Sequence, residues 1–372
     1  MLSFLKNVER VDVVFDKYLI DSLKQCTRQK RGAGSKLKVT ASTNMPKQWS
    51  NFLHDDSNKV QLFKLLAERL NAVDINCKSI VVTHGDSVIV SGQAISQTSD
   101  LQPCTHEEAD GRLLLHTMNA SLNGHKRVTI NTADTDVVII AIHIFVKMNI
   151  DELWICFSTG KHKRFLPVHE YSLSLGSEKC QALLFWFAFT GCDTVSCFYG
   201  RGKKTAWYTL IAYPDVLPVF ASLSYYPQDM DQYAQIIERY TVLLYDRTSS
   251  CKSVNECRKM LFTKKNRSID NIPPTAAALL QHSRRACYQA GTWAKCLQKI
   301  QNLPNPCQWG WDRQAVSSSY IPQWTLLAEA SKHCRELIHC GCQKLCNNNC
   351  KCIKAALVCT DLCRCDAQCP NV

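Results

Sequence analysis

The sequence has no long hydrophobic segment and lacks the motifs of several large enzyme classes. Its longest apolar runs, at residues 137–145 and 182–189, are shorter than the about 18–20 residues that cross a bilayer, which argues against a membrane span. Charge appears already at Lys6, before any apolar stretch of the kind that a secretory signal contains. We therefore expect an intracellular, reducing environment. P-loop, dinucleotide-binding and serine-triad motifs are also missing.

Acidic residues are fewer than basic ones. The 372 residues include 44 Lys and Arg against 32 Asp and Glu, which gives a formal net charge of +12 and a pI of about 8.8. This balance favours an anionic partner, in the first place nucleic acid, while a basic surface kept for solubility is the alternative. A length of 372 residues is enough for two domains or for one large domain with an appendage, and a hydrophobic fraction of 46% is enough for a core.

Cysteines are unevenly distributed, and nine of the 22 form a regular array at the carboxyl end of the chain. In a reducing compartment the scattered cysteines are expected to be small buried residues and the clustered ones metal ligands. Tetrahedral zinc takes four sulfurs, so nine thiolates satisfy three ions if three sulfurs bridge two ions each. Lys344, Lys351, Lys354 and Arg364 offset the remaining negative charge. An odd count of nine argues against a secreted disulfide knot. The predicted zinc ligands are Cys340, Cys342, Cys346, Cys350, Cys352, Cys359, Cys363, Cys365 and Cys369.

This spacing resembles the tesmin-type CXC domain of DNA-binding and chromatin-associated proteins. The resemblance implies a structural cluster of about three zinc ions and contacts with DNA or with chromatin proteins. In DNA-binding members a tyrosine precedes the central C-x-C pair, but here that position is Asn349. The zinc cluster is therefore the firmer expectation, and a protein-contact or purely structural role for the tail stays open.

Between residues 8 and 210 the pattern alternates between strands and helices. Strands are predicted at 11–15, 79–84, 87–92, 127–131 and 153–157, and helices at 17–31, 48–72, 107–121, 137–145 and 178–189. The basic segment 159–165 is predicted to be a loop, and residues 204–300 are predicted to be largely helical. Continuously apolar strands that alternate with helices indicate an α/β fold with a mostly parallel sheet covered on both faces.

Acidic residues are predicted to lie where strands end. In α/β sheets ligands bind beyond the carboxyl ends of strands, and carboxylates that meet there repel one another unless cations are bound. Mg²⁺ or Mn²⁺ prefers such oxygen ligands, and two ions about 4 Å apart support phosphodiester cleavage. Each acid taken alone is as compatible with a helix N-cap. The candidate metal ligands are Asp16, Glu108, Asp110, Asp134, Asp136 and Asp193.

These acids, in this order, resemble the motifs of the flap endonuclease/XPG-type branch of the PIN-like nucleases. The matching segments are VVFD ending at Asp16, Glu108-Ala109-Asp110, Asp134-Thr135-Asp136 and Gly191-Cys192-Asp193. The resemblance implies that Lys24, Arg28 and Arg31 grip the scissile phosphate. It also implies that the turn with Gly200, Gly202, Lys203 and Lys204 holds duplex backbone. The whole arrangement is similar to that of transposon-related animal proteins that join such a region to a cysteine-rich tail.

The family has a further aspartate on an earlier first strand, and the stretch ahead of VDVVF is too short to include that strand. Asp12 lies on the same strand as Asp16 but is not assigned the missing role.

The resulting hypothesis has four parts: a PIN-like α/β domain at 8–210, a helical extension at 211–300, a linker at 301–333 and the zinc module at 334–372. It predicts a nuclear, Mg²⁺- or Mn²⁺-dependent nuclease that acts on DNA, including branched or flapped DNA. The alternative is a catalytically inactive, nuclease-derived protein that binds DNA or chromatin. A purely structural zinc protein is a third option, but it leaves the basic residues after Asp16 unexplained.

Overall fold

The chain forms two compact units. The computed structural model describes residues 8–19, 21–25, 28, 34–44, 46–72, 79–92, 98–159, 162–263, 269–314, 319–325, 338–343, 345–355, 357–360, 363–365 and 369–371. One unit comprises residues 1–236 and 281–323, and the other comprises residues 237–280 and 324–372.

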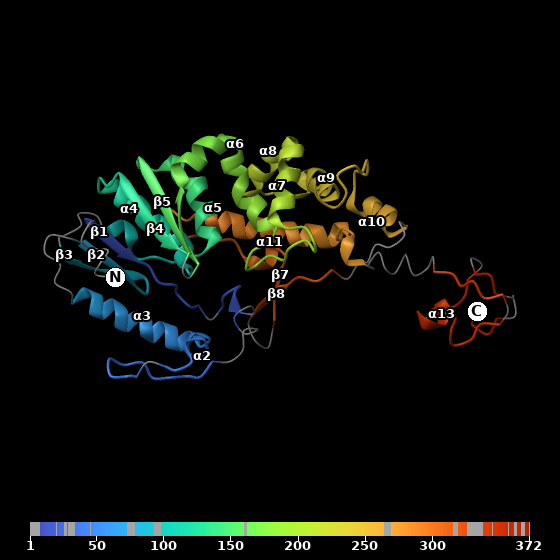
Figure 1. The fold of residues 1–372 in the computed structure, drawn as a ribbon, viewed down its shortest axis with the longest axis horizontal. Helices are drawn as coiled ribbons and strands as arrows, with labels where there is room; N and C mark the ends of the chain where they lie inside the picture. Colours follow the sequence, from blue (N-terminus) through green and yellow to red (C-terminus); the bar gives the residue numbers. More distant parts are fainter. Residues whose placement is uncertain are drawn as a thin grey trace. The chain divides into compact units, whose positions relative to one another are not determined.

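The first sheet is a three-stranded layer between two helices (Figure 1). Strand β1 (Arg10–Val13) runs parallel to β2 (Ser79–His84), and β2 forms an antiparallel hairpin with β3 (Ser87–Gly92). Side chains alternate along β2, so Ile80 and Val82 pack with α3 (Asp56–Asn71), while Val81 packs with Leu115 of α4 (Ala109–Leu122). This burial on both faces explains the continuously apolar sequence of the strand. Helix α2 (Trp49–Leu53) precedes α3.

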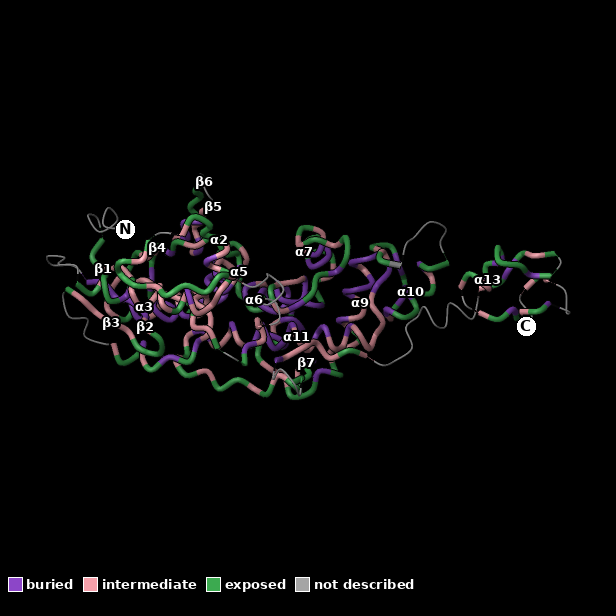
Figure 2. The backbone as a smooth tube through the Cα atoms, turned by 90° about the horizontal axis from the view of Figure 1, so that it is seen from below, coloured by how far each residue is buried: buried purple, intermediate pink, exposed green. Residues whose placement is uncertain are grey.

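The second sheet joins β4 (Arg127–Thr132), β5 (Glu152–Thr159) and β6 (His162–Pro167). Strands β4 and β5 are parallel, whereas β5 and β6 are antiparallel. Helix α5 (Thr135–Ile144) forms the crossover from β4 to β5, and α6 (Val168–Phe189) follows β6. Residues 182–189 of α6 are buried, whereas residues 162–165 of β6 are exposed (Figure 2).

The predicted α/β class is confirmed, but the sheets are mixed. Each three-stranded sheet contains one parallel and one antiparallel pair. The segment predicted as a basic loop instead supplies strand β6, because its backbone pairs with β5 from Thr159–His162 to Trp154–Pro167. The helix predicted to begin at residue 17 is wrong in its first half: residues 17–19 and 21–24 form loop and turn, and the helical bond from Arg28 N to Lys24 O is 2.9 Å long.

The region after α6 is mainly helical, as predicted for residues 204–300. Its helices are α7 (Lys203–Ala212), α8 (Leu217–Leu223), α9 (Ala234–Tyr245), α10 (Val254–Thr263) and α11 (Ala276–Ala294). Short 3₁₀ turns lie at Ser99–Leu101, Phe145–Lys147, Pro214–Val216, Asp231–Tyr233, Ile269–Asn271 and Pro306–Gln308. Within the segment predicted as a linker, β7 (Trp311–Arg313) and β8 (Tyr320–Pro322) form an antiparallel hairpin. A search of the described helices found none with the length and apolarity needed to cross a membrane.

The cysteine-rich end has very little regular structure. Its described part contains one short helix, α13 (Lys351–Lys354), and otherwise turns and extended backbone. Its buried residues are six cysteines, against which Ile338, Ile353 and the other three cysteines of the array pack. A segment with so few aliphatic side chains does not fold by hydrophobic burial alone.

Candidate functional site

Most of the predicted acids meet in one cavity of the first unit. The cavity has a volume of about 180 Å³, and its lining includes five of the six predicted carboxylates. The sixth, Asp136, has a carboxylate oxygen within 4.8 Å of those of Asp110 and Asp134. The lining residues are Asp16, Lys17, Tyr18, Lys24, Arg28, Lys59, Glu107, Glu108, Asp110, Asp134 and Asp193.

Two helix N-termini bring the acidic triad together. Asp110 lies in the first turn of α4, while Asp134 is the N-cap of α5 and Asp136 lies in its first turn. Asp134 Oδ1 accepts a hydrogen bond of 2.9 Å from Asp136 N, so the N-cap role is real. The positive ends of both helices favour negative charge at this point. The triad offers a set of carboxylate oxygens that can hold a hard cation.

Two carboxyls of the triad have raised pKa values. Burial raises the pKa of Asp110 to about 8, and the carboxylates of Glu108 and Asp134 add to the rise. Burial, followed by the Asp134 carboxylate, raises the pKa of Asp136 to about 7. Closely spaced carboxylates of this kind are accommodated by protons or by a bound cation. Their donor chemistry therefore fits a divalent ion.

Lys24 lies among these carboxylates. Its Nζ is 2.8 Å from Glu108 Oε1 and 3.2 Å from Asp193 Oδ2. Burial alone would lower the pKa of Lys24, but the Glu108 carboxylate, with Asp193 and Asp110, raises it above its usual value. Burial raises the pKa of Glu108, although Lys24 acts in the opposite direction. The lysine is a fixed positive charge inside the acidic cavity.

The aspartates at the end of the first strand have other partners. Asp16 Oδ1 accepts a hydrogen bond of 2.8 Å from Ala109 N and so caps α4, whose N-cap residue makes no such side-chain bond. Asp12 Oδ2 lies 2.7 Å from His116 Nδ1, and Arg10 donates to both oxygens of Asp12. Burial raises the pKa of Asp12, but the bonds from His116 and Arg10 outweigh it and leave that pKa below its usual value. Both carboxylate oxygens of Asp12 are therefore already bonded to Arg10 or His116.

The predicted phosphate-gripping residues form one wall of the cavity. Arg28 pairs with Glu107, lies 3.6 Å from an Asp56 oxygen, and stacks its guanidinium over the Tyr18 ring at 5.0 Å. Lys59 Nζ lies 4.3 Å from the centre of the same ring. Arg31 lies outside the described residues.

The glycine-lysine turn after Asp193 is only partly a surface feature. Lys204 is exposed and Gly202 is the N-cap of α7. Lys203 instead turns inward and donates to Phe187 O (2.8 Å), Gly191 O (2.8 Å) and Thr190 Oγ1 (3.1 Å). Burial lowers the pKa of Lys203 to about 8.

Lys203 therefore fixes the carboxyl end of α6 and the turn that carries Asp193. Gly191 in this turn has φ +113°, and a Cβ there would come within 2.8 Å of Cys197 Cβ, so the turn requires glycine. Gly200 also has a positive φ, of 66°.

All nine cysteines of the tail can act as metal ligands. Four sets of four thiols have their sulfur atoms within 4.8 Å of one another, and together these sets include every cysteine of the array. The sets are Cys340, Cys342, Cys346 and Cys350; Cys346, Cys359, Cys365 and Cys369; Cys340, Cys350, Cys352 and Cys359; and Cys340, Cys359, Cys363 and Cys365.

Three sulfurs form the centre of this cluster. The Sγ atoms of Cys340, Cys346 and Cys359 are separated by 3.6, 3.7 and 4.0 Å. A tetrahedral zinc ion with bonds of about 2.3 Å separates its sulfur ligands by about 3.8 Å. The central triangle therefore has the edge length expected when each pair of sulfurs shares one zinc ion. A further pair, Cys352 and Cys363, is 3.7 Å apart.

Backbone amides prepare some of these thiols for metal binding. Cys363 Sγ accepts bonds of 3.4 Å from Cys340 N and from Thr360 N, and these bonds lower the pKa of Cys363 to about 6. The Ile353 amide similarly lowers the pKa of Cys350 to about 6. Thiolates are the ligand form, and amide donors are typical outer partners of metal-bound sulfur.

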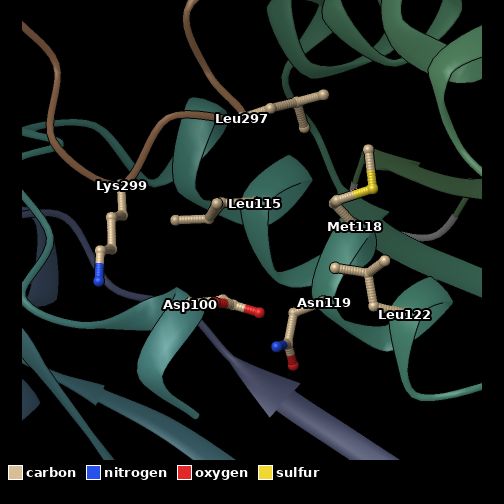
Figure 3. A pocket seen from close by; sticks show the side chains of 7 residues that line it. All are labelled: Asp100, Leu115, Met118, Asn119, Leu122, Leu297 and Lys299. Atoms are coloured by element: carbon tan, nitrogen blue, oxygen red, sulfur yellow. The ribbon is translucent and has the colours of Figure 1, made fainter. Parts of the chain in front are cut away.

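A second cavity, of about 250 Å³, has a different character (Figure 3). Leu115, Met118 and Leu122 extend into it from α4. Its lysine, Lys299, already donates to Ser99 O (2.8 Å) and Gln102 O (3.1 Å). The lining offers no cluster of ligating groups.

Several cavity residues were not predicted. Glu107 is adjacent to a predicted ligand, and its place in the acidic run could have signalled it. Tyr18 follows Asp16 closely, but its role depends on contacts with Arg28 and Lys59, which no spacing reveals. Lys59 comes from α3, outside the predicted motifs.

Comparisons with protein-family models, with curated proteins and with solved structures found no match to this chain.

Proposed function

We propose that the protein is a metal-dependent, structure-preferring DNA nuclease with a zinc-thiolate tail. The observation that carries this proposal is the convergence of the predicted acids, from the segment after β1, from α4, from α5 and from the turn after α6, in one cavity. Their order along the chain is that of the PIN-like nuclease motifs, and an α/β arrangement agrees with such a domain. The net charge of +12 fits a nucleic-acid partner.

The acidic cavity would hold Mg²⁺ or Mn²⁺. Asp110, Asp134 and Asp136 would ligate one ion, and Glu108 and Asp193 face the same cavity and would ligate a second. Bound there, the ions would stabilise charge on a phosphate and lower the pKa of an attacking water.

The chain's own groups have complementary tasks. Arg28, which lines the cavity, can orient a phosphate by two N–H donors once Glu107 releases it. Lys24 supplies positive charge beside the carboxylates, and Lys203 positions Asp193 through the α6 terminus. Exposed Lys204, at the start of α7, forms no ion pair with the described residues and can contact duplex backbone.

The tail would hold three zinc ions with Cys340, Cys346 and Cys359 as the bridging sulfurs. Each pair of bridging sulfurs is then completed by two terminal sulfurs. Cys342 and Cys350 complete the ion shared by Cys340 and Cys346, and Cys365 and Cys369 complete the ion shared by Cys346 and Cys359. Cys352 and Cys363 complete the ion shared by Cys340 and Cys359. Each cysteine is then used once, either as a bridge or as a terminal ligand. The tail would serve as a stabilised module that helps to target the nuclease, through DNA or chromatin proteins in the nucleus.

One observation favours the alternative of an inactive, DNA-binding protein. Asp16 caps α4 and Asp12 is bound by Arg10 and His116, so the first strand supplies no free carboxylate to the triad. Loss of one metal ligand reduces catalysis by orders of magnitude while leaving nucleic-acid binding intact.

A cleavage assay decides between the two. Purified protein is incubated with labelled flap, bubble and single-stranded DNA and with Mg²⁺ or Mn²⁺, beside the variant Asp134→Ala/Asp136→Ala. We expect metal-dependent cleavage by the wild type and a loss of at least about a thousandfold in the variant. Absence of cleavage, combined with retained salt-sensitive binding, would establish the inactive alternative.

The chain offers a matched control in Asp229→Ala/Asp231→Ala. These exposed aspartates have the same spacing and the same hydrogen bond, 2.9 Å from Asp231 N to Asp229 Oδ1, but lie outside the cavity. This double variant should cleave like the wild type.

A further inference from the structure

Among the described cations that line the acidic cavity, Lys24 differs from the others in its partners. Lys17 pairs with Asp86, Arg28 with Glu107, and Lys59 with Asp56 at 2.7 Å, none of which is a predicted metal ligand. Lys24 alone of these four is bonded to two predicted ligands, Glu108 at 2.8 Å and Asp193 at 3.2 Å. A cation thus already bridges two of the three predicted carboxylates that lie outside the triad.

We infer that the Lys24 ammonium occupies the place of the second metal ion, so that the free protein takes up one divalent ion at Asp110, Asp134 and Asp136 and admits another only when Lys24 leaves. This inference rests on the proposed function, because it presumes that the triad binds a divalent cation. It adds that the two ion positions are unequal and that a residue of the chain controls the second.

The distances make the two occupants mutually exclusive. A divalent ion bonded to Glu108 and Asp193 needs metal–oxygen distances of about 2.0–2.2 Å. It would then lie within a few ångströms of an ammonium held at 2.8 and 3.2 Å from the same carboxylates. The two charges of the ion and the single charge of the ammonium group repel each other strongly at that separation in a partly buried site. Either the lysine or the ion can hold these oxygens.

The lysine is also a persistent competitor. Its ammonium contacts the carboxylates of Glu108 and Asp193, and the carboxylates of Asp110 and Asp136 interact with it at longer range. Movement of Lys24 towards a substrate phosphate would release the second position.

Counting bound manganese tests the inference without measuring catalysis. Zinc-loaded full-length protein, free of nucleic acid, is titrated with Mn²⁺, and free Mn²⁺ is followed by electron paramagnetic resonance. We expect one Mn²⁺ per chain for the wild type and two for Lys24→Met, with Lys24→Gln as a second variant of different polarity. Lys59→Met is the matched control, because Lys59 lines the same cavity but pairs with Asp56, and it should bind one.

The outcomes separate the inference from the proposed function. Two ions on the wild type, or one ion on both Lys24 variants with native circular dichroism, would overturn the role given to Lys24 while leaving the triad as a metal site. No Mn²⁺ on the wild type would overturn the metal site itself. Addition of Asp193→Asn to Lys24→Met should return the count to one, which locates the second ion.

Discussion

Removal of zinc with a strong chelator is expected to unfold residues 338–371 and to leave the α/β unit folded. The described tail has one four-residue helix, and its buried core is made of cysteines. Metal binding therefore supplies its folding free energy, about 10–16 kcal/mol for a structural zinc site at neutral pH. The measurement is zinc release together with two-dimensional NMR, in which tail signals collapse to random-coil positions and signals of the α/β unit stay dispersed.

Single cysteine variants distinguish the bridging sulfurs from the terminal ones. Cys346 belongs to two of the sulfur sets, whereas Cys342 belongs to one. We expect about three zinc ions in the wild type, about two in Cys342→Ser and about one in Cys346→Ser, counted by native mass spectrometry. Cys307→Ser, an exposed cysteine outside the array, should retain the full count. Equal losses at Cys342 and Cys346, or a tail closed by disulfides, would contradict the bridged cluster.

The stability of the α/β unit without divalent cations is expected to fall as the pH rises from about 5 to 8. The pKa of Asp110 is raised from 3.8 to about 8 and that of Asp136 to about 7, so both carboxyls are protonated in the folded state at a pH where the unfolded chain has lost those protons. Folding then takes up protons. The free energy of unfolding is greatest at a pH below the carboxyl pKa of the unfolded chain, and it falls as the pH rises through the carboxyl pKa values of the folded state. For Asp110 the loss is on the order of 4 kcal/mol.

Urea unfolding at pH 5 and pH 8 measures this effect. Asp110→Asn cannot ionise, so this variant should depend less on pH and should be more stable than the wild type at pH 8. Addition of Mn²⁺ should restore the wild type at pH 8, because an ion that binds only the folded state stabilises it by mass action. Asp231→Asn, which changes an exposed aspartate outside the cavity, should follow the wild type. An Asp110→Asn profile as steep as that of the wild type would show that the carboxyl is ionised when folded.

Hydrophobic periodicity predicted much of the fold, because burial on both faces leaves a direct record in the sequence. The hairpin β2–β3, helix α4, strand β4 and helix α5 all appear where their patterns place them. Strand β6 was missed because it is an exposed edge strand whose residues show no apolar alternation, and its pairing with β5 is a tertiary choice. The composition of the strands also does not reveal whether neighbouring strands pair in parallel or antiparallel.

The order of the acids predicted which side chains meet, but not what each one does there. Asp134 both caps α5 and joins the triad, whereas Asp16 is turned to the α4 terminus. Lys203, which the resemblance places in a turn that holds duplex backbone, donates hydrogen bonds to the carbonyls at the end of α6. The contacts of a side chain depend on its burial and on its distance from nearby groups, and the spacing of a motif specifies neither quantity.

The central claim is that carboxylates from separate segments form one divalent-cation site, and manganese-soaked crystals test it most directly. Anomalous scattering recorded near the manganese edge should show a peak bonded to oxygens of Asp110, Asp134 and Asp136, at about 2.2 Å from each. The peak should be missing from crystals of Asp134→Ala/Asp136→Ala. A map from wild-type crystals with no manganese at the triad, at a concentration that saturates surface sites, would contradict the account.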